Sequence, residues 1–171
     1  RLRTGTGSHR ENRDSKAKKL SRCTSSGTMK KQILVIMEDF YYIERFKQAQ
    51  DLGVYDKALE EVRNGRKTGH WIWFIFPQLR GFGSSYNSHF YGITCADEAK
   101  AYLADPVLGG RLRAITQAFL DTSLSPFEVF GRVDTLKLRS CMTLFDFVSP
   151  NDLFGQVLEA KFEVERDIYS L

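Results

Sequence analysis

The stretch from Gly65 to Gly83, GRKTGHWIWFIFPQLRGFG, constrains the fold of this chain most. Its centre, Trp71–Phe76, holds two tryptophans and two phenylalanines in six residues. Both alternate faces of this centre are apolar, so we expect it to be buried on all sides, as a short helix or a core strand. Pro77 ends it, because the residue before a proline disfavours the α conformation. The polar residues at its two ends should then lie at the rim of the core, where a pocket can form.

Charge is divided unevenly along the 171 residues, a length that suits one domain and a tail. Residues 1–31 contain ten Lys or Arg and two Asp or Glu, which leaves 15 basic and 19 acidic residues for the rest. The first part is also poor in aliphatic residues, so we predict a disordered basic tail. Because the remainder is mildly acidic, we expect nucleic-acid contact only through the tail.

Three interpretations of the tail stay open: a solvated leader, an organelle transit segment, or an arm that touches nucleic acid or membrane. No apolar run approaches the length of a membrane span, so we predict no membrane partner. Cys23, Cys95 and Cys141 lack CxxC spacing, which excludes a disulfide framework and a structural zinc site. We therefore predict no metal or cofactor and an intracellular location, cytoplasmic by default, with organelle targeting by the tail as the alternative. The sequence leaves the oligomeric state open.

Helical periodicity and helix boundary signals dominate the rest of the chain. Asp105-Pro106 and Ser125-Pro126 are typical helix starts, with a capping side chain followed by proline at the first helical position. Only Ile33–Met37 is short and β-branched enough to be either an edge strand or the lead-in to a helix. The predicted helices are 38–50, 55–64, 85–91, 96–103, 105–120, 127–130, 134–148 and 153–162, with Gly131 between the sixth and seventh.

This pattern predicts the all-α class. We expect a compact orthogonal multi-helix domain of about seven short helices, with a disordered basic N-terminal tail. The predicted organisation is a tail over residues 1–31 and a single helical domain over residues 38–165.

Two residues at the start of the aromatic stretch are candidates for chemistry. His70 could act as an acid, a base or a donor to a phosphate, because only histidine titrates near neutral pH without perturbation. The alternative is a histidine that bonds to backbone at a helix start. Trp71 borders the polar lead-in and could stack on a planar ligand, whereas Trp73 has apolar neighbours and is expected mainly in the core.

Polar residues farther along supply a candidate binding set. Gln78 and Arg80 follow the aromatic centre, and Lys137, Arg139 and Ser140 come from a later helix. Cations beside a Gly-rich loop suit a phosphate or a carboxylate. The alternative for each of them is a solvated helix face with local ion pairs.

The common sequence signatures of enzymes are absent from the chain. It contains no GxxxxGK[ST], HExxH or GxSxG motif and no GxGxxG motif after a strand. No specific reaction class is therefore favoured, and the sequence does not decide whether the protein is an enzyme.

Several motifs resemble those of a family of mainly α-helical domains of unknown function, numbered 1810 in domain catalogues. The resemblance covers about two thirds of the chain in order, and its most specific motifs are HWIWFIFPQL and KLRSCMTLF. The matching segments are RFKQAQ (45–50), YDKALEEVRNGRKTGHWIWFIFPQLRGFG (55–83), YLADPVLGGRL (102–112), FG (130–131) and LKLRSCMTLF (136–145).

The resemblance implies a compact helical domain and no established activity. Some members carry the label calpastatin, but that inhibitor is a disordered repeat protein, unlike a chain with a dense aromatic core. The chain departs from the family pattern at Asp105, where histidine is common, at Cys141, where serine is common, and after Phe162. Asp105 could therefore move a proton in place of that histidine, or it could serve only as a helix cap.

Two functions follow as hypotheses. The first is binding or hydrolysis of a small anionic, nucleotide-like ligand of the ADP-ribose type, by analogy at fold level with a small helical domain linked to ADP-ribose and riboflavin-pathway N-glycosidic bonds. In it, Trp71, Gln78, Arg80, Lys137, Arg139 and Ser140 would bind, and His70 or Asp105 would move a proton. The second is a non-catalytic protein-interaction module.

Overall fold

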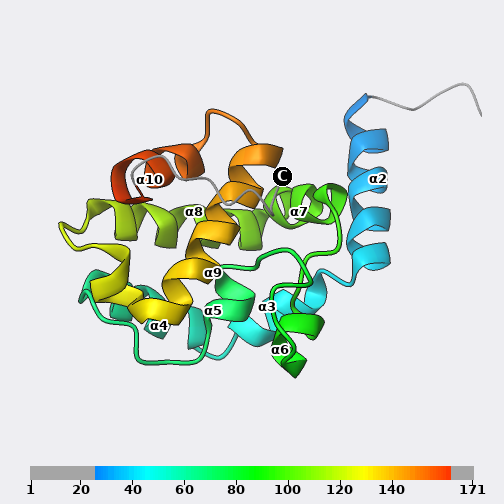
Figure 1. Ribbon diagram of the computed structural model, residues 1–171. Coiled ribbons are helices and arrows are strands. Elements are labelled where there is room, and N and C mark those ends of the chain that lie inside the picture. The colour runs from blue at the N-terminus through cyan, green and yellow to red at the C-terminus, as the bar shows by residue number, and fades with distance from the viewer. Residues whose placement is uncertain (1–25, 163–171) are drawn as a thin grey trace, which may run out of the picture. The chain divides into compact units, whose positions relative to one another are not determined.

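The computed structural model describes residues 26–162 (Figure 1), and every regular element in this range is a helix. The all-α prediction is therefore confirmed. Contacts divide the chain into two units, one up to Ile36 and one from Met37 onward. Most of the predicted disordered tail, residues 1–25, lies outside the described residues.

The first described helix is α2, Ser26–Tyr41. It includes Ile33–Met37, so this run is helical and not a strand. It also includes residues 26–31, which the sequence assigned to the tail. The helix expected over 38–50 is divided, because Tyr42 adopts the left-handed conformation with φ of 50°, and α3 begins only at Glu44 and ends at Gln50.

Helices α4 (Val54–Arg63) and α5 (Ile72–Ile75) flank residues 64–71, which form the lead-in to the aromatic centre. The aromatic centre is a helix of four residues, one of the two predicted alternatives. After Pro77 the chain pairs with the segment that follows α6 (Tyr86–Phe90). The amide of Arg80 donates to the carbonyl of Ile93 at 2.8 Å, and the amide of Ile93 donates to the carbonyl of Gln78 at 2.9 Å. This pairing fixes the backbone on either side of Leu79.

The last four helices are α7 (Ala96–Ala104), α8 (Pro106–Asp121), α9 (Pro126–Val148) and α10 (Leu153–Phe162). Both predicted start signals are confirmed: the Asp105 carboxylate accepts from the first amides of α8, and Ser125 forms a capping box with Glu128. Gly131 has φ of 74° and ψ of 175°, a region open essentially only to glycine, and it kinks α9 where the sequence predicted a break.

Helix α9 organises the core of the unit that starts at Met37. It contacts α10, α7 and α5, while α8 contacts α4, α7 and α10. Figure 1 shows α9 running between α5 on one side and α10 on the other. The largest fully buried side chains come from six segments: Phe46, Phe76, Tyr102, Phe119, Phe145 and Phe154. The contact of α5 with α9 brings the aromatic stretch beside residues more than 50 positions later in the chain.

Among residues 26–162, no helix is long and apolar enough to cross a membrane. The same range contains no group of three or more His, Cys, Asp or Glu residues arranged to hold a metal ion.

Candidate functional site

A cavity of about 330 Å³ lies between α9 and the segment that follows α5. We call it the α9 cavity. It is lined by Gln78, Phe82, Val133, Leu136, Lys137, Arg139 and Ser140. Four of these residues are in the binding set predicted from the sequence, and they come from two segments that are distant along the chain.

The floor and the rim of the α9 cavity differ in chemistry. Gln78 and Ser140 are buried, with exposed fractions of 6% and 4%, and they place an amide and a hydroxyl against the cavity. Phe82, Val133 and Leu136 are exposed apolar side chains. A few polar groups within an apolar lining are typical of sites that bind small molecules.

A network of charges holds Lys137 beside the cavity. Its ammonium lies 2.7 Å from Asp134 Oδ1 and 3.9 Å from the centre of the Trp73 ring. Lys67, from the basic lead-in, lies 2.7 Å from the other oxygen of Asp134. Burial alone would raise the pKa of Asp134, but hydrogen bonds from Lys137 and Lys67 outweigh it and lower that pKa. Two ammonium groups therefore share one ionised carboxylate, which leaves an excess of one positive charge.

Glu61 of α4 fixes the lead-in from the other side. Its Oε2 accepts hydrogen bonds from the amide of Thr68 at 2.8 Å, the amide of Gly69 at 2.9 Å and Nε1 of Trp71 at 2.8 Å. Burial would raise the pKa of Glu61, yet these donors together lower it to about 2. The other oxygen, Oε1, is buried without a hydrogen-bond partner among the described residues. The conformation of residues 67–71 thus depends on one ionised carboxylate.

The stability of the folded protein should depend on pH through Glu61. The pKa of Glu61 is lower in the folded chain than its ordinary value of 4.5, so its stabilising contribution is complete above about pH 5 and is lost as the pH falls toward 2. From the size of the shift, we expect Glu61 to account for about 2 kcal/mol of the stability that the protein loses between pH 7 and pH 3. Urea unfolding at the two pH values measures this loss.

The Glu61→Gln variant should lose less free energy of unfolding than the parent protein between pH 7 and pH 3. The matched control is Glu60→Gln, which changes the exposed neighbour on the same helix and should leave the pH dependence of the parent protein. Equal pH dependence of the parent and the Glu61→Gln variant would contradict the role given to this carboxylate.

Both tryptophans contact the core, but Trp71, whose position the sequence left open, is the more deeply buried of the two. Trp71 is only 3% exposed and belongs to the core, where its ring meets Phe76 and Phe130. Trp73 is only partly buried and carries Lys137 over its face. The reason is Glu61, because its hydrogen bond to Nε1 draws Trp71 inward. Trp71 does not line the α9 cavity, so its stacking on a ligand stays a prediction that this cavity does not use.

The other candidate residues lie away from the α9 cavity. His70 is exposed and is not among the residues that line it. Asp105 is 2% exposed; it accepts from the amides of Val107 and Leu108 at 2.9 Å and pairs with Lys47 at 2.7 Å, so it serves as a helix cap. Arg80 is exposed and faces a different cavity, which also contains Tyr86 and Phe90.

Sequence reasoning missed the apolar rim and the carboxylates that support the site. Val133, Leu136 and Ser140 follow one another at spacings of three and four, so helical periodicity alone could have placed them on one face of α9. Asp134 and Lys137 have the spacing of a helical ion pair. Nothing local marks Glu61 as different from its neighbour Glu60.

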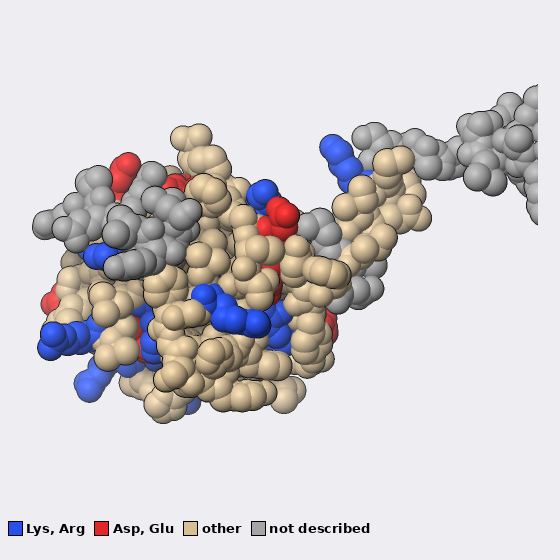
Figure 2. Space-filling model, turned by 45° about the vertical axis from the view of Figure 1, so that its right-hand side comes forward, with Lys and Arg blue, Asp and Glu red and all other residues tan. Residues whose placement is uncertain are grey.

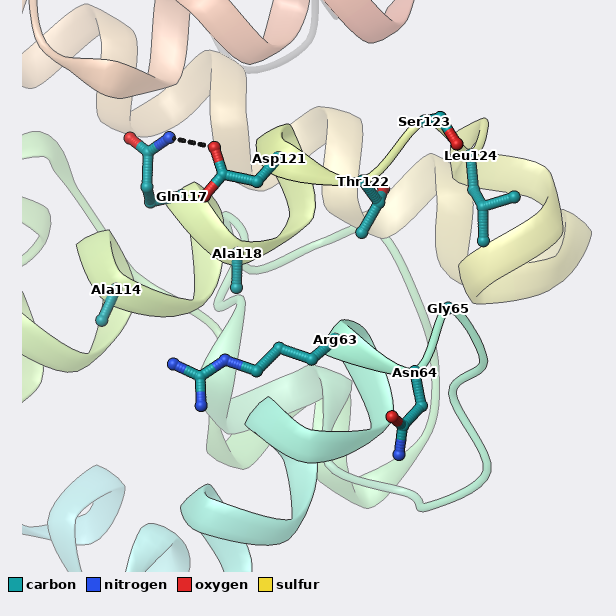
Figure 3. A pocket seen from close by; sticks show the side chains of 10 residues that line it. All are labelled: Arg63, Asn64, Gly65, Ala114, Gln117, Ala118, Asp121, Thr122, Ser123 and Leu124. Atoms are coloured by element: carbon teal, nitrogen blue, oxygen red, sulfur yellow. Dashed lines mark hydrogen bonds between the residues drawn. The ribbon is translucent and has the colours of Figure 1, made fainter.

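A larger cavity, of about 620 Å³, lies where α4 and α8 end (Figure 3). The Arg63 side chain extends across it toward α8, and on the far side Gln117 donates to Asp121 at 2.7 Å. Its lining includes none of the binding residues predicted from the sequence. On the face of the molecule in Figure 2, Lys and Arg side chains are interspersed with acidic and uncharged ones, so charge does not single out one site there.

Comparison with known proteins identifies the family to which this chain belongs. The model of the family described as "Protein of unknown function (DUF1810)" matches residues 40–171. The chain belongs to this family. The crystal structure of the conserved hypothetical protein Rv1873 from Mycobacterium tuberculosis is similar, with 42% identity and a TM-score of 0.73 over 76% of this chain and 94% of that chain. Among curated proteins the comparison found no match. The resemblance inferred from the motifs is therefore confirmed for this DUF1810 chain.

Proposed function

We propose that the α9 cavity binds a small anionic ligand of the nucleotide type. The observation that carries the proposal is the convergence of Gln78 with Lys137, Arg139 and Ser140 on one cavity that also has an apolar rim. The cations suit a phosphate, and the buried amide and hydroxyl suit the polar edge of a sugar or base. Phe82 and Leu136 offer apolar surface to the planar part of such a ligand.

The size of the cavity favours a compact ligand. A volume of about 330 Å³ is at the lower end of the range of roughly 300–1,000 Å³ for small-molecule sites. A mononucleotide, or the phosphoribosyl part of ADP-ribose, is thus the expected occupant.

The proposal is limited to binding, without a hydrolytic step. The residues that line the cavity are amide, hydroxyl, cationic and apolar, and His70 and Asp105 are not among them. The lining thus contains no histidine or carboxylate, the side chains that most often move protons in catalysis.

Thermal-shift measurements with AMP, ADP-ribose and inorganic phosphate test the proposal. At a ligand concentration 100 times Kd, binding should stabilise the protein by about 2.7 kcal/mol, which raises Tm by about 5–10 °C. Lys137→Ala should weaken binding by about tenfold or more, since it removes a charged contact worth about 1.5–3 kcal/mol.

The matched control is Lys100→Ala. Lys100 also pairs with an aspartate three residues earlier on a helix, and it lies outside the cavity. It should bind like the parent protein. If millimolar ligand leaves Tm unchanged, or if both lysine variants lose affinity equally, the α9 cavity is not the site.

A further inference from the structure

A second cavity, of about 560 Å³, lies among the end of α2, α3, α6 and the segment that leads into α7. We call it the aromatic groove. Its lining residues include four aromatic ones, Phe40, Tyr42, Tyr86 and Phe90, and two at its rim that can donate hydrogen bonds, Arg80 and His89. It shares no lining residue with the α9 cavity, so it is a separate feature of the surface.

The rings of the aromatic groove face solvent to an extent that the fold does not require. Phe40 is 79% exposed, Tyr86 is 74% exposed and Tyr42 is 50% exposed. Tyr86 stacks on Phe90, with the ring centres 5.5 Å apart and the planes 11° apart, and Tyr42 meets Phe90 edge-on at 6.5 Å. Clustered exposed rings around a hollow are typical of binding surfaces.

The backbone at Tyr42 is strained where it presents its ring to the groove. A bulky residue with φ of 50° is conformationally unfavourable and persists only where the surroundings impose the conformation. Because half of its surface is exposed, the ring of Tyr42 recovers little of this cost by burial. Strain of this kind is concentrated at functional sites.

Buried Arg45 imposes this conformation and ties the two walls of the groove together. Its Nη1 donates to the carbonyls of Tyr41 at 2.6 Å and Tyr42 at 2.9 Å, and its Nε donates to the carbonyl of Phe90 at 2.8 Å. Its Nη2 pairs with Glu98, which is 1% exposed. The groove is therefore preorganised before any ligand binds, which lowers the entropy cost of binding.

We propose that the aromatic groove binds a proline-rich peptide in the polyproline II conformation, with acidic residues next to the prolines. Flat pyrrolidine rings pack on exposed aromatic faces, and a polyproline II backbone has free carbonyls that can accept from tyrosine hydroxyls. Tyr86 lines the groove and carries such a hydroxyl, whereas the Tyr42 hydroxyl donates to Gln48 Oε1 at 3.4 Å.

The charges of the groove select the flanking residues. Arg45 and Glu98 neutralise each other, which leaves Arg80 as the cation and His89 as an additional N–H donor on the rim. An acidic flank complements them. A nucleic acid is disfavoured, because residues 32–171 contain more acidic than basic side chains.

A synthetic peptide of ten prolines followed by two glutamates is the probe. Titrated into the isotope-labelled full chain, it should give saturable NMR shift changes at residues around Tyr42, Tyr86 and Phe90. Tyr86→Ala should weaken binding by about tenfold or more, as expected for a central aromatic contact. Replacing the two glutamates with lysines should also weaken it.

Phe127→Ala is the matched control, because Phe127 is 63% exposed and lies outside the groove. It should bind the peptide like the parent protein. The proposal is overturned if millimolar peptide causes no saturable shifts, if Tyr86→Ala binds as well as Phe127→Ala, or if an oligothymidylate binds the groove more tightly than the peptide. None of these results depends on the α9 cavity.

Discussion

Trp71→Ala is expected to lower the free energy of unfolding by about 3–5 kcal/mol, the usual cost of truncating a large buried ring. Trp71 is 3% exposed, packs against Phe76 and Phe130, and donates Nε1–H to Glu61. The truncation leaves a void and also removes one of the donors that keep Glu61 ionised. Urea unfolding at pH 7 gives the value.

Trp73→Ala is the comparison that makes this result specific. Trp73 is only partly buried, and its cation–π contact with Lys137 is worth about 0.5–1 kcal/mol. We therefore expect a clearly smaller loss than for Trp71→Ala. The loss of stability in Trp71→Phe should lie between those of the two alanine variants. This variant keeps a ring but removes the hydrogen-bond donor to the Glu61 carboxylate. A larger loss at Trp73 than at Trp71 would refute the assignment of Trp71 to the core.

Arg45→Met should destabilise the protein by about 3–5 kcal/mol, because it leaves a buried carboxylate without its cation. Arg45 is 6% exposed and pairs with Glu98, which is 1% exposed. The variant also frees the carbonyls of Tyr41 and Tyr42 that the guanidinium caps. Chemical denaturation of the variant and the parent protein measures the difference.

Two further variants test whether the loss in Arg45→Met comes from the unpaired carboxylate of Glu98. Lys100→Met breaks the exposed pair with Asp97 and should cost less than about 1 kcal/mol. The double variant Arg45→Met/Glu98→Leu should recover part of the loss, since it removes the unpaired charge as well. If Arg45→Met costs no more than Lys100→Met, the buried pair does not hold α3 to α7.

Much of the helical fold was predictable because residues close in sequence determine where its helices begin and end. Asp105 and Ser125 cap helices through amides two or three residues away, and Gly131 has a backbone conformation that glycine alone tolerates. The break at Tyr42 was missed because the nearby Arg45 that supports it is held in place by distant partners. The Arg45 side chain contacts Phe90 and Glu98, 45 and 53 positions later in the sequence.

The candidate site was predictable in part for the same reason. The sequence marked Gln78 and the Lys137–Ser140 segment as polar borders of apolar elements, and the contact of α5 with α9 brings them to one cavity. The roles of Trp71 and Trp73 could not be assigned, because both faces of Trp71–Phe76 are apolar. The choice is made by Glu61, one of the two glutamates on α4.

An NMR titration of the isotope-labelled protein with AMP decides whether the α9 cavity binds a ligand. We expect saturable shift changes at the side-chain amide of Gln78 and at the backbone of residues 137–140, which weaken in Lys137→Ala and persist in Lys100→Ala. Saturable changes confined to residues outside the α9 cavity, or none at millimolar AMP, would contradict this expectation.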